Sequence, residues 1–198
     1  MPDRPDLAAL IGSRICHDLI SPIGAIGNGL ELLMLDSAAT VPEMTLMTES
    51  VGNATARIRF FRVAYGLALG EHRLARGEVQ SILSDLTRGG RLHVDWQSGA
   101  DLPRGDVKIV FLLFQCLESA MPYGGKISVG VSDGRWIVHG AADRLKIDPA
   151  LWDILVNPAA SAQVTAAQVQ FPLVAEEIAR RQRRLAVQLG DGEIRLSF

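Results

Sequence analysis

Cysteine is scarce in this chain of 198 residues, where only Cys16 and Cys116 occur, and aromatic residues make up no more than 6%. The two cysteines lie far apart and form no CxxC pair, so neither a disulfide framework nor a cysteine zinc site is expected. The chain also has no large excess of one charge, since its formal net charge is −2. It therefore gives no reason to expect a nucleic acid as a partner. The most apolar run, Ile109 to Phe114, is too short to cross a bilayer.

The N-terminal residues show no basic segment followed by an apolar one, which is the pattern of a signal peptide. We therefore expect a cytoplasmic protein that does not bind a membrane. Apolar residues account for 48% of the chain, which is enough for a folded protein with one or two small cores. Cys16 is expected to pack as a small apolar residue.

Two long helical segments are predicted at the start of the chain. The first begins after an N-cap at Asp6 and runs to about Leu35, and the second begins at a capping box, Thr40-Val41-Pro42-Glu43, and ends near Gly66 or Gly70. The second carries a coiled-coil type seam at Met44, Met47, Val51, Ala54, Ile58, Phe61, Tyr65 and Ala68. The short connection makes the helices antiparallel. One hairpin cannot bury both apolar faces, so we predict a homodimer with a four-helix bundle.

Beyond residue 75 the pattern changes to short helices and alternating strands. Helices are expected at 78–86, 106–121 and 148–156, with a mainly helical segment at 165–184 that is interrupted near Pro172. Strands are expected at 91–97, 126–132, 135–139, 185–189 and 193–198, with hairpin turns at Asp133-Gly134 and Gly190-Asp191-Gly192. The predicted fold class is α+β, with a helical hairpin over 1–74 and a two-layer α/β sandwich over 75–198.

The most informative motif lies in the first helix, Ser13-Arg14-Ile15-Cys16-His17-Asp18-Leu19-Ile20-Ser21-Pro22. His17 lies off the apolar stripe of that helix and is expected to point to solvent, where a neutral imidazole is available as a nucleophile. A proline inside a helix costs roughly 3 kcal/mol and bends it, which favours a local purpose for Pro22 over an incidental kink.

The neighbours of His17 each have a functional and a structural interpretation. Asp18 either orients the imidazole or is a solvated surface acid, and Arg14 either neutralises a phosphoryl oxygen or is an ordinary exposed charge. Ser13, Ser21 and Gly24 are small, which would let a partner approach closely, although a glycine can also serve close helix packing.

The run from His17 to Pro22 resembles the H-box of bacterial histidine kinases, and its place in the first helix of a hairpin followed by an α/β domain supports the likeness. The second domain departs from kinases where ATP would bind. Gln115 and Ser119 stand where kinases carry asparagines, one of them a magnesium ligand, and serine is a poor ligand for that ion. The adenine-binding DxGxG loop is lost at 138–145, and no glycine-rich phosphate loop occurs at 158–171.

A kinase-like hairpin with a degenerate ATP domain resembles the ChpT-type histidine phosphotransferases, most closely over residues 13–33. This resemblance implies a dimeric cytoplasmic relay protein of two-component signal transduction in the cell cycle, with His17 as phosphoacceptor. Its implied partners are the receiver domain of a CckA-like hybrid histidine kinase and response regulators similar to CtrA and CpdR. No cofactor is expected in this chain, since the receiver supplies Mg²⁺.

Two other functions remain open at this point: a divergent ATP-dependent histidine kinase and a non-catalytic adaptor that binds receivers. The arginines at 180, 181, 183 and 184 either attract an acidic receiver or form a solvated helix face. His72, His93 and His139 are interpreted as structural.

Overall fold

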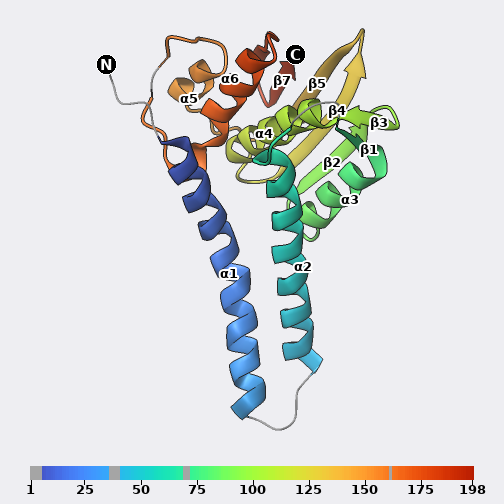
Figure 1. The fold of residues 1–198 in the computed structure, drawn as a ribbon, viewed down its shortest axis with the longest axis vertical. Coiled ribbons are helices and arrows are strands. Elements are labelled where there is room, and N and C mark those ends of the chain that lie inside the picture. Colours follow the sequence, from blue (N-terminus) through green and yellow to red (C-terminus); the bar gives the residue numbers. More distant parts are fainter. Residues whose placement is uncertain (1–5, 36–40, 69–71, 161) are drawn as a thin grey trace.

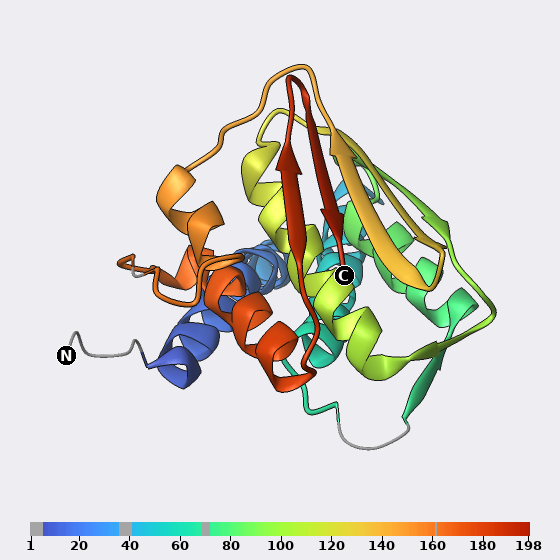
Figure 2. The same cartoon turned by 90° about the horizontal axis from the view of Figure 1, so that it is seen from above.

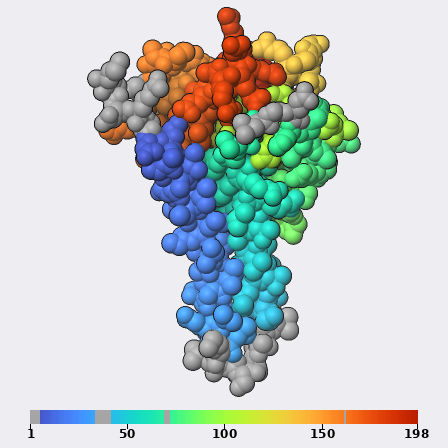
Figure 3. Space-filling model, viewed as in Figure 1, coloured from blue at the N-terminus to red at the C-terminus, as the bar shows by residue number. Residues whose placement is uncertain are grey.

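A computed structural model describes residues 6–35, 41–68, 72–160 and 162–198. Helices α1 (Leu7–Leu35) and α2 (Val41–Ala64) form a long antiparallel hairpin that projects from a compact α/β part (Figure 1). The Asp6 carboxylate accepts a hydrogen bond from the Ala9 amide at 3.1 Å, which confirms the predicted N-cap. Thr40 of the predicted capping box lies outside the described residues. The space-filling view shows the hairpin as a narrow stalk (Figure 3).

The second part is a two-layer sandwich, as predicted (Figure 2). Its sheet has the strand order β2-β4-β5-β7-β6, in which β2 runs parallel to β4 and every other pair is antiparallel. The strands are β2 (Leu92–Gln97), β4 (Gly125–Ser132), β5 (Arg135–Ala141), β6 (Ala186–Leu189) and β7 (Glu193–Ser197), and the main helices are α3 (Arg76–Thr87), α4 (Arg104–Ala120) and α6 (Gln170–Arg180). Both predicted β-hairpins are confirmed.

Two local predictions need correction. The helical segment after residue 165 breaks at Val169, between a 3₁₀ turn, η1 (Ala166–Gln168), and α6. Pro172 lies in the first turn of α6, where the lost amide donor has no helical partner in any case. Two strands of three residues, β1 (Arg73–Ala75) and β3 (Asp101–Pro103), pair antiparallel and are too short for alternation to reveal. Helix α5 (Pro149–Ile154) is confirmed, with Asp148 as its N-cap.

Helix α4 joins the hairpin to the sandwich, because it is buried on nearly all sides between the sheet and α2. Phe60 of α2 is 1% exposed and stacks on Phe111 of α4, with ring centroids 4.7 Å apart. The Nη2 of Arg104 donates to the Arg62 carbonyl at 2.6 Å, and Lys108 Nζ donates to the Gly66 carbonyl at 3.1 Å. Two cations of α4 thus bind carbonyls at the C-terminal end of α2, where the helix dipole favours positive charge.

Helix α2 ends at Ala64, earlier than the predicted range. Gly66 explains the early end, because a Cβ at this position would lie 2.2 Å from the Arg62 carbonyl oxygen. The backbone therefore leaves the helix where only glycine permits this close approach, and the freed carbonyls turn to α4.

Three arginines at the end of α6, Arg180, Arg181 and Arg183, form internal ion pairs, although Arg180, Arg183 and Arg184 remain exposed as the solvated-face interpretation expected. Arg180, Arg181 and Lys108 surround the buried Glu177 carboxylate. Burial alone would raise the pKa of Glu177, but hydrogen bonds from Arg180 and Lys108 outweigh it and hold the pKa below its ordinary value. Arg183 pairs with buried Asp106 at 3.3 Å. Both interpretations of this cluster, receiver attraction and a solvated face, overlooked these internal contacts.

None of the helices that the structure describes is both long enough and apolar enough to span a bilayer.

Candidate functional site

The His17 side chain is 83% exposed on α1, which confirms the position predicted for it. Its Nδ1 lies 3.1 Å from Oδ1 of Asp18. An ionised carboxylate only accepts hydrogen bonds, so this contact forms when Nδ1 carries the proton. In that tautomer the lone pair is on Nε2, which leaves this nitrogen available as a nucleophile.

Asp18 is held by two arginines and is only 9% exposed. Its Oδ2 accepts hydrogen bonds from Arg14 Nε at 2.9 Å and from Arg57 Nη1 at 3.3 Å. The interpretation of Asp18 as a solvated surface acid is therefore wrong. The geometry agrees with the other interpretation, in which the carboxylate orients the imidazole.

Arg14 is also not the exposed charge that one interpretation required, since its side chain is 15% exposed. Besides its bond to Asp18, its Nη1 donates to the Ala167 carbonyl at 2.9 Å. Arg14 thus connects α1 to the 3₁₀ turn η1 of the sandwich and fixes the Asp18 carboxylate from one side.

Arg57 is the residue of this site that the sequence did not reveal. It lies on α2, 39 positions from Asp18, and nothing in the local pattern separates it from Arg59 and Arg62 of the same helix. Arg59 pairs instead with Asp85 of α3 at 2.8 Å, and Arg62 lies 3.8 Å from Glu78. Only the packing of α1 against α2 distinguishes Arg57 from these two.

The small residues around His17 are on the surface, as the docking interpretation requires. Ser13, Ser21 and Gly24 are exposed, and a Cβ added to Gly24 would meet nothing within 4 Å. Gly24 therefore serves no close packing within the single chain, whereas Gly29 does, since its Cβ would lie 2.5 Å from Met47 Cγ. Cys16 is exposed in the single chain, contrary to the prediction that it packs as a small apolar residue.

A hollow of about 400 Å³ opens beside the histidine, between α1, α2 and the turn that follows α3. Asp18, Ser21 and Arg57 line it together with Arg88 and Gly89 of the turn. The charged network around Asp18 is thus accessible from the solvent side of the hairpin.

The hairpin also carries an unpartnered apolar surface. Large apolar side chains on both helices are about half exposed or more: Ile20, Ile23 and Leu30 on α1 and Met44, Val51 and Ile58 on α2. The α2 positions recur every seven residues, which is the spacing of a coiled-coil seam. Ala54 and Phe61 of the predicted seam are buried within the chain, so the seam divides between an inner and an outer face.

In helix α4, the two polar side chains that were compared with kinase asparagines, Gln115 and Ser119, form hydrogen bonds within the chain. Gln115 is 3% exposed and exchanges two hydrogen bonds with the Tyr65 hydroxyl, at 3.1 and 3.0 Å. Ser119 Oγ donates to the Cys116 carbonyl of its own helix at 2.7 Å. The Gln115 side-chain oxygen therefore accepts from Tyr65, and the Ser119 hydroxyl proton is donated within its own helix. Among the residues that the structure describes, no cluster of three or more histidine, cysteine or acidic side chains is placed to hold a metal ion.

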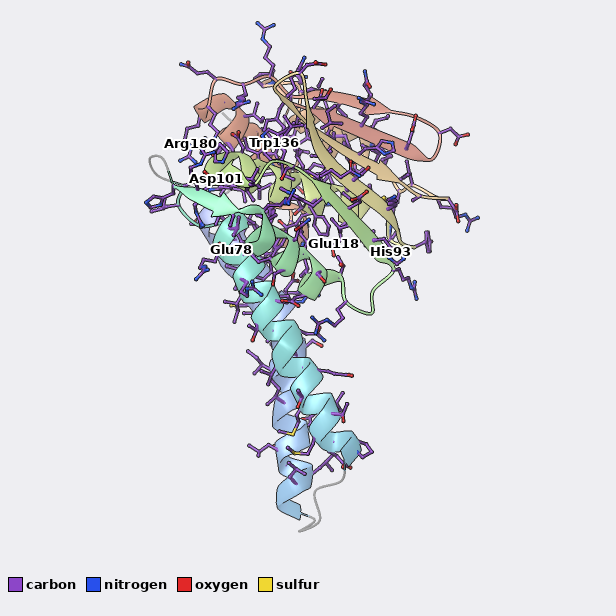
Figure 4. The ribbon with its side chains drawn as sticks, turned by 90° about the vertical axis from the view of Figure 1, so that its right-hand side faces the viewer. Glu78, His93, Asp101, Glu118, Trp136 and Arg180 are labelled. Carbon is purple, nitrogen blue, oxygen red and sulfur yellow. The ribbon has the colours of Figure 1, made fainter. Side chains whose placement is uncertain are left out.

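Glu118 of the same helix lies near the level at which the hairpin joins the sandwich (Figure 4). Burial raises the pKa of Glu118, while the positive charges of Arg14 and Arg57 lower it and the negative charge of Asp18 raises it. Glu118 is thus an electrostatic neighbour of the same two arginines that bind Asp18.

Comparison with known proteins gives a consistent result. Residues 76–193 match the family model of the histidine phosphotransferase C-terminal domain. The protein phosphotransferase ChpT of Brucella abortus (strain 2308) is 33% identical over 171 residues, which cover 83% of this chain and 81% of that protein. A solved bacterial phosphotransferase structure superimposes with a TM-score of 0.82 and 29% identity, over 100% of this chain and 97% of that one. The histidine kinase AdeS of Acinetobacter baumannii gives a TM-score of 0.46 and 12% identity, over 91% and 95%.

Proposed function

This chain belongs to the family of ChpT-like histidine phosphotransferases, and we propose that His17 is the residue that carries the phosphoryl group. The observation that carries the proposal is an exposed imidazole whose Nδ1 is bound to a nearly buried carboxylate. The relay that we propose takes phosphoryl from the receiver domain of a hybrid histidine kinase, CckA-like, and passes it to CtrA-like and CpdR-like response regulators in the cytoplasm.

In the proposed reaction, Nε2 of His17 attacks the phosphorus of a receiver aspartyl phosphate in line. The N–P bond forms as the P–O bond to the receiver aspartate breaks, and the aspartate leaves as a carboxylate. With a proton on Nδ1, the phosphorylated ring carries a positive charge, which the Asp18 carboxylate stabilises at 3.1 Å. The reverse step, with a second receiver, regenerates the neutral imidazole.

We propose further that the chain has no ATP-dependent autokinase activity and binds no cofactor. Supporting this, Gln115 is 3% exposed and bound to Tyr65, and the neutral hydroxyl of Ser119 is a poor ligand for a magnesium ion with a triphosphate. The Mg²⁺ that neutralises the phosphoryl charge is expected in the acidic pocket of the receiver.

Two labelling reactions test the function. A receiver phosphorylated on its aspartate is expected to transfer acid-labile label to this chain within minutes, whereas labelled ATP with Mg²⁺ is expected to leave it unlabelled. Self-labelling from ATP would identify a divergent kinase. Binding of the receiver without any acid-labile label would identify a non-catalytic adaptor.

We also propose a homodimer in which the exposed apolar residues of α1 and α2 pack against a second copy. Ile58→Asp places two carboxylates in that interface, and the dimer is expected to weaken roughly a hundredfold or more, because an unpaired buried charge is strongly destabilising. Sedimentation equilibrium measures the dissociation constant. Asn53→Asp is the matched control, since it adds the same charge on α2 about 140° around the helix from Ile58. An Ile58→Asp protein that stays as dimeric as the control contradicts the proposed interface.

A further inference from the structure

Two cations bind one oxygen of Asp18 and leave the other oxygen to the histidine. Arg14 of α1 and Arg57 of α2 both donate to Oδ2, at 2.9 and 3.3 Å, while Oδ1 faces Nδ1 of His17 at 3.1 Å. This division fixes the carboxylate plane, because rotation of Asp18 would break the bonds to both helices. The orientation of the imidazole thus depends on a residue from the opposite helix of the hairpin.

The two arginines are not equivalent. Arg14 is 15% exposed and its Nη1 is occupied by the Ala167 carbonyl, so it is fixed in the junction between α1 and η1. Arg57 is 40% exposed and lines the hollow together with Asp18 and Ser21. Arg57 is therefore the cation on the solvent side of the carboxylate.

Glu118 adds a like charge near this site. Burial raises its pKa, and the positive charges of Arg14 and Arg57 lower it. Without Arg57, Arg14 alone would hold Oδ2 of Asp18, from one side only. The plane of the Asp18 carboxylate would then be less fixed, and its hydrogen bond to His17 would weaken.

We propose that Arg57 is a positioning residue for phosphoryl transfer: by holding Oδ2 of Asp18 it keeps Oδ1 on Nδ1 of His17 and so keeps Nε2 as the free nucleophilic nitrogen. The inference rests on the proposed role of His17 as phosphoacceptor. Arg57 acts through Asp18, so its loss lowers the rate of transfer and leaves receiver binding unchanged.

Single-turnover transfer from a phosphorylated receiver tests this role. Arg57→Ala is expected to slow the transfer about tenfold, as is typical when a residue that orients a reacting group is lost, with an unchanged dissociation constant for the receiver. Arg57→Lys is expected to restore part of the rate. Arg59→Ala is the matched control, because it removes the same charge and one ion pair from α2 at a position that pairs with Asp85 of α3. In an Asp18→Asn background, Arg57→Ala is expected to slow transfer no further.

A second measurement does not depend on transfer. Nitrogen NMR of the His17 ring is expected to show the Nδ1–H tautomer in the wild-type chain and a shift toward Nε2–H in Arg57→Ala, but not in Arg59→Ala. Equal rates and equal tautomer populations in Arg57→Ala and wild type would overturn the inference. A wild-type chain that accepts no phosphate would instead defeat the proposed function, and the ring spectra would still decide whether Arg57 positions the histidine.

Discussion

Replacing His17 with alanine is expected to abolish labelling by a phosphorylated receiver. The reaction needs a nitrogen lone pair to form the N–P bond, and alanine has none, so the loss of rate should reach roughly 10³-fold or more. The His17 side chain is 83% exposed, so the substitution should change the free energy of unfolding by no more than about 0.5 kcal/mol. The measurement is acid-labile label per chain after incubation with the phosphorylated receiver.

The control for this experiment is His93→Ala, which removes another exposed imidazole, from strand β2 in the sandwich. It should keep full labelling. Label retained by His17→Ala would place the phosphoacceptor elsewhere in the chain, and a dimer lost together with the label would mean that the substitution acts through assembly instead of chemistry.

Phe60→Ala is expected to lower the free energy of unfolding by about 3–5 kcal/mol. The ring is 1% exposed, stacks on Phe111 at a centroid distance of 4.7 Å and lies 5.7 Å from Phe114. Its removal leaves a cavity at the junction between α2 and α4, where neither helix can move to fill the space without losing its other contacts. Urea denaturation followed by circular dichroism measures the change.

Leu67→Ala is the control for the effect of losing an apolar side chain, since Leu67 is 72% exposed just beyond α2. Its stability should stay close to that of the wild-type chain. A loss of less than about 1 kcal/mol in Phe60→Ala would show that the hairpin and the sandwich are held together mainly by the polar contacts of Arg104 and Lys108.

Local pattern was sufficient for much of the fold. The spacing of apolar residues predicted α1 and the alternating strands. The Asp-Gly pair predicted the hairpin turn at Asp133-Gly134, where both residues have positive φ. The same spacing placed His17 on the surface. These features depend on residues within a few positions of one another, so they can be predicted directly from the amino-acid sequence.

Errors in prediction occurred where a residue's environment comes from distant segments. Cys16 was expected inside and is exposed, because its surroundings depend on what packs against α1 and not on its own polarity. Asp18 was open to an interpretation as a surface acid, although Arg57, 39 positions away, binds it. The carbonyls at the end of α2 are bound by Arg104 and Lys108 of α4, and no local signal announces these contacts.

The amino-acid order alone determined an exposed histidine beside an acid on the outer face of a helix, together with the elements of an α/β sandwich. Tertiary structure decided how that acid is held, since Arg57 reaches it from the second helix of the hairpin. The physical reason is range: helix and strand periodicity arises from neighbours in sequence, whereas the electrostatic environment of a carboxylate is set by every charge that folding brings within several ångströms.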